Sequence, residues 1–192
     1  MSEKALLVQD ENAESKDLLC ALSSMNYETI QMVKKTDDIV RHARDYEPDI
    51  VVMDVYRPVN ALLKMVAALV DCRPVPIVMF VEESSDNMIA DVIRCGISAY
   101  VVDGYQRDRV RGIIDIARAR FKEKQALLNE LEDTRNALAS RKTIDRAKGI
   151  VMKQKNCNEE VAYQLIRKMA MDKNMKIVDI AEQLIGLADL MQ

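Results

Sequence analysis

The chain has 192 residues, with a hydrophobic fraction of 49%, a charged fraction of 31% and a formal net charge of −3. Only five glycines and four prolines are present, which favours a folded, helix-rich protein over a disordered or low-complexity one. The amino-terminal apolar run is too short for a signal peptide, and no stretch approaches the roughly 20 apolar residues of a membrane helix, so we expect a cytoplasmic protein without membrane contact.

Residues 1–118 alternate short apolar runs with helical patterns. Helical periodicity is found at 12–25, 36–46, 60–70 and 86–95. Between these stretches lie five runs that are typical of strands, the second and the fifth being the weaker: Ala5–Val8, Thr29–Val33, Ile50–Met53, Ile77–Val81 and Tyr100–Val102. This alternation predicts an α/β domain, a doubly wound five-stranded parallel sheet.

Two acidic residues stand at strand ends of this expected sheet. Asp10 follows the first strand and Asp54 ends the third. Because parallel strands end at the same edge, both carboxylates should meet in the crevice where such sheets bind ligands. Over roughly residues 1–118 the pattern resembles the receiver domain of bacterial response regulators. The resemblance implies that Asp54 is the phosphoacceptor and that Asp10 is one of two acidic residues that bind Mg²⁺.

The sequence departs from the receiver pattern at three positions. Gln9 stands at the second acidic position, Val81 replaces a Ser or Thr, and Asp103 replaces a Lys. Phosphoryl transfer needs cations around the transferred group, and Mg²⁺ prefers carboxylate ligands. We therefore expect Asp54 to be a vestigial phosphoacceptor in a degenerate receiver, with at most weak Mg²⁺ binding at Asp10 and Asp54. A working phosphorylation switch at Asp54 is the alternative.

A single helical pattern starts at Asp108, and no Gly or Pro occurs from 114 to 146. It predicts a helix of roughly 30 or more residues over 108–140, too long to be covered by the sheet domain alone. Its apolar seam is interrupted by Lys124 and Arg135, and a parallel coiled-coil homodimer would cover it. Packing within the chain is the alternative. The expected seam consists of Ile114, Ala117, Phe121, Leu128, Leu131 and Leu138.

Three shorter helical patterns follow in residues 141–192. Apolar stripes within 143–155, 161–169 and 177–185 predict an all-α three-helix bundle. Asn158 is expected to cap the second of these helices. Residues 141–176 carry ten Lys or Arg against four acids, and such a basic region on an acidic chain is typical of phosphate-backbone binding. A solvated helical surface is the alternative.

This bundle is similar to the ANTAR domain of bacterial RNA-binding transcription antiterminators. The resemblance is carried by residues spread over all three helices: Ile144, Ala147, Lys148, Gly149, Ile150, Val151, Met152, Glu159, Glu160, Ala162, Leu165, Ile166, Arg167, Ile177, Ile180 and Ala181. A degenerate receiver, a long helix and an ANTAR domain in this order is similar to the NasT-type nitrate-assimilation regulators and, more distantly, to the AmiR-type amidase regulators.

The resemblance implies a bacterial antiterminator that binds stem-loops in nascent leader RNA and so prevents a terminator hairpin. For NasT-like proteins it also implies control of nitrate and nitrite assimilation genes through a NasS-like nitrate sensor. DNA binding by the three-helix end, as in a helix-turn-helix factor, is the alternative from another class.

The expected RNA contacts follow partly from the resemblance and partly from charge. Lys148 and Arg167 match family positions, and Gly149 beside Lys148 is small enough to leave the ammonium group approachable. Charge alone adds six backbone candidates: Arg141, Lys142, Arg146, Lys153, Lys155 and Lys168.

Residues for catalysis or structural metal binding are scarce. His42 is the only histidine, and the four cysteines form no Cys-x-x-Cys pair. No nucleophile–base pair or phosphate-binding glycine loop is visible either. We therefore expect neither an enzyme nor a metalloprotein.

Overall fold

Strands and helices alternate in the first part of the chain, as the apolar runs predict. The structure, a computed structural model, describes residues 3–10, 15–25, 27–35, 37–84 and 86–190. It divides the chain into two compact units, Met1–Gln125 and Ala126–Gln192. Within the described residues, no helix combines the length and the apolarity needed to cross a membrane.

The first unit contains a parallel sheet in the order β2-β1-β3-β4-β5. Its strands are β1 (Glu3–Gln9), β2 (Tyr27–Lys34), β3 (Ile50–Val55), β4 (Ile77–Val81) and β5 (Ala99–Val101). Its connecting helices are α1 (Lys16–Ser23), α2 (Ile39–Tyr46), α3 (Asn60–Cys72) and α4 (Asp86–Arg94). The predicted doubly wound sheet is confirmed. Residues 12–14 of the first predicted helix lie outside the described residues.

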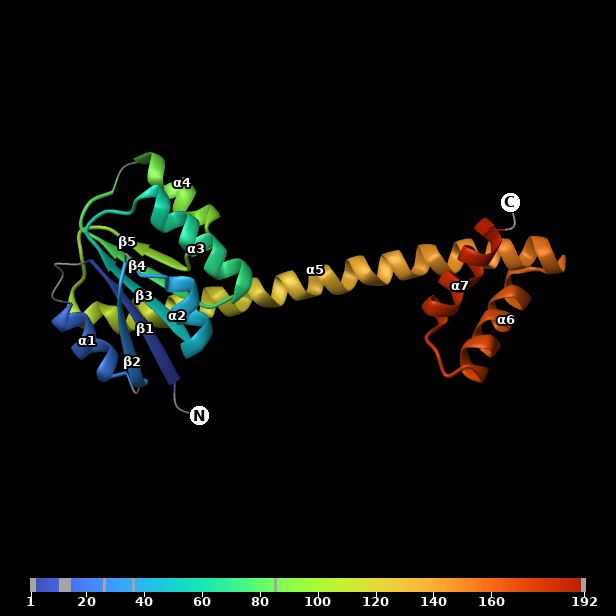
Figure 1. Cartoon of the computed structure of the whole chain (residues 1–192), viewed down its shortest axis with the longest axis horizontal. Coiled ribbons are helices and arrows are strands. Elements are labelled where there is room, and N and C mark those ends of the chain that lie inside the picture. Colours follow the sequence, from blue (N-terminus) through green and yellow to red (C-terminus); the bar gives the residue numbers. More distant parts are fainter. Residues whose placement is uncertain (1–2, 11–14, 26, 36, 85, 191–192) are drawn as a thin grey trace. The chain divides into compact units, whose positions relative to one another are not determined.

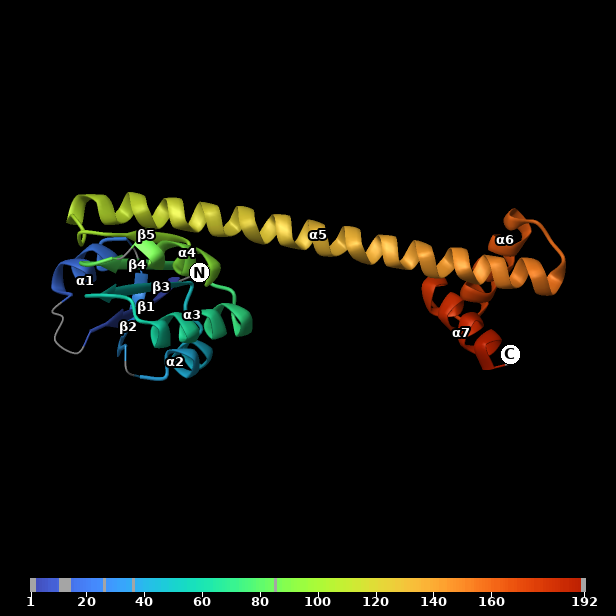
Figure 2. The ribbon, with the colours of Figure 1, turned by 90° about the horizontal axis from the view of Figure 1, so that it is seen from above.

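Helices cover both faces of this sheet, which explains why consecutive residues in the middle of its central strands are apolar. Helices α2 and α3 pack on one face through side chains such as Ile39 and Val66. Helix α1 and the start of the next helix, α5, pack on the other face through Leu18 and Val110. Figure 2 shows α5 and the α2–α3 pair on opposite sides of the strands. A strand buried on both faces cannot alternate polar and apolar residues.

Helix α5 is continuous from Arg107 to Lys155, a length of 49 residues (Figure 1). The sequence pattern predicted a long helix ending near residue 140 and a separate bundle helix starting at 143, and this prediction was wrong. Polar residues around the expected break are accommodated inside the helix, because the Thr143 hydroxyl donates to the carbonyl oxygen of Ala139 at 3.2 Å. Such a bond to the preceding turn leaves the helical ladder intact.

The first part of α5 belongs to the core of the first unit. Ile114 and Ala117 are fully buried against the sheet of their own chain, so their assignment to a dimer seam was wrong. Phe121 is half-buried. Leu128, Leu131 and Leu138 keep about half of their surface exposed, at 47%, 46% and 54%. The apolar residues of α5 therefore form two different surfaces: the first part packs in the core of the first unit, and the later part is exposed.

The second unit is a three-helix bundle made of the end of α5, α6 (Glu159–Asp172) and α7 (Ile177–Leu190) (Figure 1). Its core contains small and branched side chains from all three helices, among them Ala147, Ile166 and Ala181. The Asn158 side chain accepts a hydrogen bond from the Val161 amide at 2.9 Å, which confirms the predicted cap. This cap fixes where α6 begins beside α5.

Candidate acidic pocket and nucleic-acid interface

The two acidic residues of the first unit meet at the carboxyl edge of the sheet. The Asp10 amide donates to the Asp54 carbonyl oxygen at 3.2 Å, and β1 pairs with β3 so that Gln9 lies opposite Asp54. The expected convergence of Asp10 and Asp54 is therefore observed. Their carboxylates define what we call the acidic pocket.

Both oxygens of the Asp10 carboxylate are already engaged. Oδ1 forms an ion pair with the Lys35 ammonium, and Oδ2 accepts a hydrogen bond from the Tyr56 amide at 2.7 Å. Lys35 directly follows β2, which ends at the same sheet edge. The pattern of acidic residues at strand ends did not indicate this lysine, because it is a basic residue. A survey of every residue that follows a strand would have found this cation.

The Asp54 carboxylate accepts hydrogen bonds from two hydroxyl groups. The buried Ser15 hydroxyl donates to Oδ2 at 2.6 Å, and the Tyr105 hydroxyl donates as well. Burial raises the pKa of Asp54. The two hydrogen bonds lower this pKa in part, and the nearby Asp10 charge raises it further, so that it stays above its ordinary value. Burial, with the nearby Asp54 charge, raises the pKa of Tyr105 to about 12, so this hydroxyl keeps its proton as a donor.

The acidic pocket does not fit Mg²⁺. Both Asp10 oxygens have partners, Asp54 accepts two hydroxyls, and Gln9 contributes a neutral amide whose buried Oε1 has no hydrogen-bond partner in the described part of the chain. No cluster of three or more acidic, His or Cys ligands occurs among the described residues. Mg²⁺ prefers unengaged carboxylate and water oxygens in octahedral geometry. The weak Mg²⁺ binding considered at Asp10 and Asp54 is therefore not supported by this arrangement.

The positions that depart from the receiver pattern supply no cation either. Val81 is buried, and Asp103 is exposed in a left-handed turn with φ of 67°. The Gly104 amide after it donates to the Val81 carbonyl oxygen at 3.0 Å, so the backbone closes this edge. Val81 and Asp103 therefore stand at the positions where the receiver pattern has a hydroxyl and a lysine, and the hydroxyl groups that contact Asp54 come from Ser15 and Tyr105 instead.

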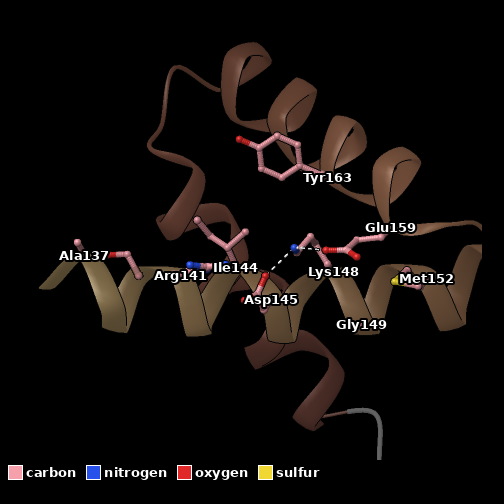
Figure 3. Close-up of a pocket in the computed structure, with 10 residues that line it drawn as sticks. Ala137, Arg141, Ile144, Asp145, Lys148, Gly149, Met152, Glu159 and Tyr163 are labelled. Carbon is pink, nitrogen blue, oxygen red and sulfur yellow. Dashed lines mark hydrogen bonds and ion pairs between the residues drawn. The ribbon is translucent and has the colours of Figure 1, made fainter. Parts of the chain in front are cut away.

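The second unit holds a groove of about 670 Å³ between α5 and α6 (Figure 3). We call it the α5–α6 groove. Six of its lining residues can take part in recognition, since they are charged, aromatic or, for glycine, leave the backbone uncovered: Arg141, Asp145, Lys148 and Gly149 from α5, and Glu159 and Tyr163 from α6. The α5 residues recur at three- and four-residue intervals, which places them on one face of the helix.

Lys148 lies at the centre of an ion network in this groove. Its Nζ lies 2.6 Å from Asp145 Oδ1 and 2.6 Å from Glu159 Oε1, as Figure 3 shows, and its side chain is 15% exposed. Asp145, and then Glu159, raise the pKa of Lys148, while Lys148 lowers the pKa of Asp145. The expectation of a freely approachable ammonium was wrong, because two carboxylates hold it from both helices.

The other predicted basic residues fall into distinct groups. Arg146 forms an ion pair with Asp189 of α7 at 2.9 Å, so its positive charge is partly compensated within the bundle. Arg141 lines the groove, and Arg167 follows Tyr163 by one helical turn on α6. The remaining candidates are exposed and have no ion-pair partner in the described part of the chain: Lys142, Lys153, Lys155 and Lys168.

Comparison with known families and proteins identifies the second unit. Residues 132–185 match the family model described as the ANTAR domain. The transcriptional regulatory protein PdtaR of Mycobacterium tuberculosis is 27% identical over 179 residues, covering 93% of this chain and 87% of that protein. The nitrate regulatory protein of Klebsiella oxytoca is 40% identical over 78 residues, covering 41% of this chain but only 20% of that protein. These relatives are regulatory proteins.

Among solved structures, the signal receiver domain of a modulated diguanylate cyclase from Desulfovibrio desulfuricans has a TM-score of 0.54 and 20% identity. The likeness covers 65% of this chain and 99% of that one. At this identity it establishes the fold of the first unit and nothing about its chemistry.

Proposed function

We propose that this chain, whose residues 132–185 match the ANTAR domain, is a transcription antiterminator that binds stem-loops of nascent leader RNA and prevents terminator formation. The observation that carries the proposal is the α5–α6 groove lined by Arg141 and Lys148, in a unit that matches the ANTAR family and also carries the exposed cations Lys142, Lys153, Lys155 and Lys168. Leader transcripts are made in the bacterial cytoplasm, and the proposal places the protein there.

RNA fits this surface better than duplex DNA does. Sequence-specific RNA binding uses unpaired loop bases that enter pockets, whereas helix-turn-helix factors insert a helix into the major groove. In the second unit, Arg141, Lys148 and Glu159 gather around a recess between two helices rather than along one protruding helix. A recess receives single bases, so we favour stem-loop RNA over DNA.

Binding measurements test the choice between RNA and DNA. The full chain is titrated with a paired stem-loop RNA that carries six-nucleotide loops, and with the same sequence as duplex DNA, at about 0.15 M salt. We expect the RNA to bind at least about tenfold more tightly, since base contacts add to the phosphate contribution. Equal affinity, with the same salt dependence for both, would contradict the proposal.

We further propose that the controlled genes serve nitrate and nitrite assimilation, through a NasS-like nitrate sensor. The support is the likeness of part of the chain to the nitrate regulatory protein. Affinity purification of the tagged full chain from native cells, with and without nitrate, tests this partner. We expect a periplasmic-binding-type protein to be recovered without nitrate and released by nitrate. Recovery that nitrate does not change would contradict this assignment.

A phosphorylation switch at Asp54 is the second candidate function, favoured by the receiver fold alone. The acidic pocket argues against it, because Lys35, Ser15 and Tyr105 already hold the two carboxylates. Incubation with a small phosphodonor and Mg²⁺, followed by intact-mass analysis, decides between them. We expect no stable phosphoryl adduct on Asp54.

A further inference from the structure

We infer that the α5–α6 groove is the subsite for one unpaired guanine base of the bound RNA. The inference rests on the proposed RNA-binding function and names the chemical group that this groove takes. It assigns Lys148 to base recognition rather than to contact with the phosphate backbone.

The charge of the groove favours a neutral ligand over a phosphate. Arg141 and Lys148 contribute two positive charges to its lining, and Asp145 and Glu159 contribute two negative ones. A phosphate next to Lys148 would also lie next to both carboxylates, and this repulsion opposes the attraction. An uncharged base avoids it. The phosphates of the RNA would then bind to exposed cations outside the ion network, such as Arg167.

The hydrogen-bonding groups in the groove match the edge of guanine. An ammonium group has three N–H donors, and Lys148 directs two of them to Asp145 Oδ1 and Glu159 Oε1. The third donor and the second oxygen of each carboxylate have no hydrogen-bond partner among the described residues. Guanine is the only RNA base with two adjacent N–H donors beside a carbonyl acceptor on its pairing edge. One carboxylate accepts the two N–H groups, the first at its unpartnered oxygen and the second at the remaining lone pair of the oxygen that Lys148 contacts, and Lys148 donates to the carbonyl oxygen.

The groove also has a wall and enough room for a base. Figure 3 shows the Tyr163 ring on α6 standing across the groove from the α5 side chains. The ring is 37% exposed, so a flat base has an aromatic surface against which to stack. The volume of about 670 Å³ lies inside the range of roughly 300–1,000 Å³ for small-ligand sites.

Gly149 provides a way to fill the groove without disturbing the bundle. A Cβ atom at Gly149 would have no heavy atom within 4 Å, so a side chain there extends into open groove space. Gly186 on α7 is equally open but does not line the groove, which makes it the matched control. Both glycines are helical, so both substitutions raise helix propensity by a similar amount.

The test uses the full chain and a pool of paired stem-loop RNAs with randomised six-nucleotide loops. Wild-type protein selects its preferred loops, and sequencing identifies any loop position that is fixed as guanine. Gly149→Ala and Gly149→Leu are then compared with Gly186→Ala and Gly186→Leu on the selected RNA. We expect the Gly149 variants to weaken binding progressively, by about 5-fold to 100-fold, the range for losing one stacked base. We expect the Gly186 variants to bind like wild type.

Inosine, which lacks the amino group of guanine, tests the hydrogen-bonding assignment. Inosine at the selected position should weaken wild-type binding, and Glu159→Gln should largely abolish the difference between guanine and inosine. Tyr163→Leu should weaken binding, and Tyr163→Phe, which keeps the ring, should restore it. Circular dichroism confirms the helix content of each variant.

Two results overturn the inference, and they are distinguishable. If wild-type protein selects loops with a fixed guanine and Gly149→Leu keeps both affinity and preference, the groove is not the guanine site, while the RNA-binding function stands. If wild-type protein enriches no loop sequence and binds no RNA of the pool, the proposed function fails together with the inference.

Discussion

The acidic pocket of the first unit and the α5–α6 groove of the second both contain a lysine held by carboxylates, yet they differ in what remains available. In the pocket, Lys35 pairs with Asp10, whose other oxygen is taken by the Tyr56 amide. In the groove, Lys148 pairs with Asp145 and Glu159 but keeps a donor, and each carboxylate keeps an oxygen. In the described part of the chain both Asp10 oxygens are engaged, although the buried Gln9 Oε1 has no partner, whereas the groove keeps one donor and two exposed acceptor oxygens.

This difference teaches that local charge is a poor guide to a binding site. A buried or half-buried polar group whose hydrogen bonds are complete gains nothing from a ligand, whereas one with spare donors and acceptors does. We propose the α5–α6 groove as the binding site, because Lys148 keeps a donor and Asp145 and Glu159 each keep an acceptor oxygen among the described residues.

The largest expected effect concerns α5 outside both sites. Leu128→Glu combined with Leu131→Glu places charge on the exposed apolar part of the proposed homodimer seam. We expect a monomer by sedimentation and at least about tenfold weaker binding to paired stem-loop RNA, because one groove then acts alone. Asn129→Glu with Asn136→Glu adds the same charge away from the seam and serves as the control. An unchanged sedimentation mass would refute the seam.

The next effect compares the groove directly with the pocket. Lys148→Ala and Arg167→Ala should each weaken RNA binding by roughly 1–3 kcal/mol, the range for one lost base or stacking contact. Lys35→Ala removes the same charge from the acidic pocket and should leave the RNA dissociation constant unchanged. Lys173→Ala, at the end of α6, controls for charge loss within the bundle. An equal loss of RNA affinity in all four variants would mean that binding depends on net charge and not on these particular residues.

A smaller effect is expected from the pocket itself. Asp54→Asn should keep antitermination in a reporter assay within about twofold of wild type, because the proposed RNA contacts lie outside the pocket. The loss of most activity in a folded variant would instead support a phosphorylation switch.

The same variant has a pH-dependent effect on stability. Burial raises the pKa of Asp54 in the folded state above its unfolded value, so its ionisation opposes folding increasingly as pH rises through that interval. Asp54→Asn should therefore raise the melting temperature more at pH 7 than near pH 3.5, below the ordinary Asp pKa of about 3.9. An equal change at both pH values would contradict the assignment of the raised pKa.

The smallest expected effect is that of Mg²⁺ on the wild-type chain. Since Lys35 and the Tyr56 amide occupy the Asp10 oxygens, millimolar Mg²⁺ should shift the melting temperature by less than about 1 °C. Lys35→Ala frees one oxygen and removes a positive charge, so it should make the melting temperature more sensitive to Mg²⁺. A clear stabilisation of the wild type by Mg²⁺, absent with an equal ionic strength of NaCl, would show that the pocket binds the ion.

The sequence was a good guide where one local pattern has one structural solution. Ile77–Val81 is a strand with the predicted bounds, since a short apolar run between turns fits a doubly covered sheet. Asn158 caps α6 as predicted, because the cap depends only on residues within one turn. The ANTAR match at 132–185 agrees with the resemblance carried by Lys148 and its neighbours.

The site was predicted less completely, because ion pairs across elements have no sequence period. Lys35 and Asp10 are brought together by β2 and β1, and nothing in their sequence separation indicates this. Lys148 was expected to be approachable because its neighbours are small. Glu159, the first residue of α6 after the Asn158 cap, reaches Lys148 across the two helices, a contact that the neighbouring residues in the sequence do not indicate.

The parallel sheet, the helical bundle and the excess of positive charge in residues 141–176 could be predicted from local periodicity and composition, whereas the continuity of α5 could not. Only the tertiary structure decided what each apolar or charged side chain contacts. Ile114 and Leu128 share one apolar pattern on one helix, yet the sheet buries the first and leaves the second exposed. An apolar stripe on a helix indicates a face that packs against another element, and the positions of the neighbouring elements determine which residues of that stripe are buried.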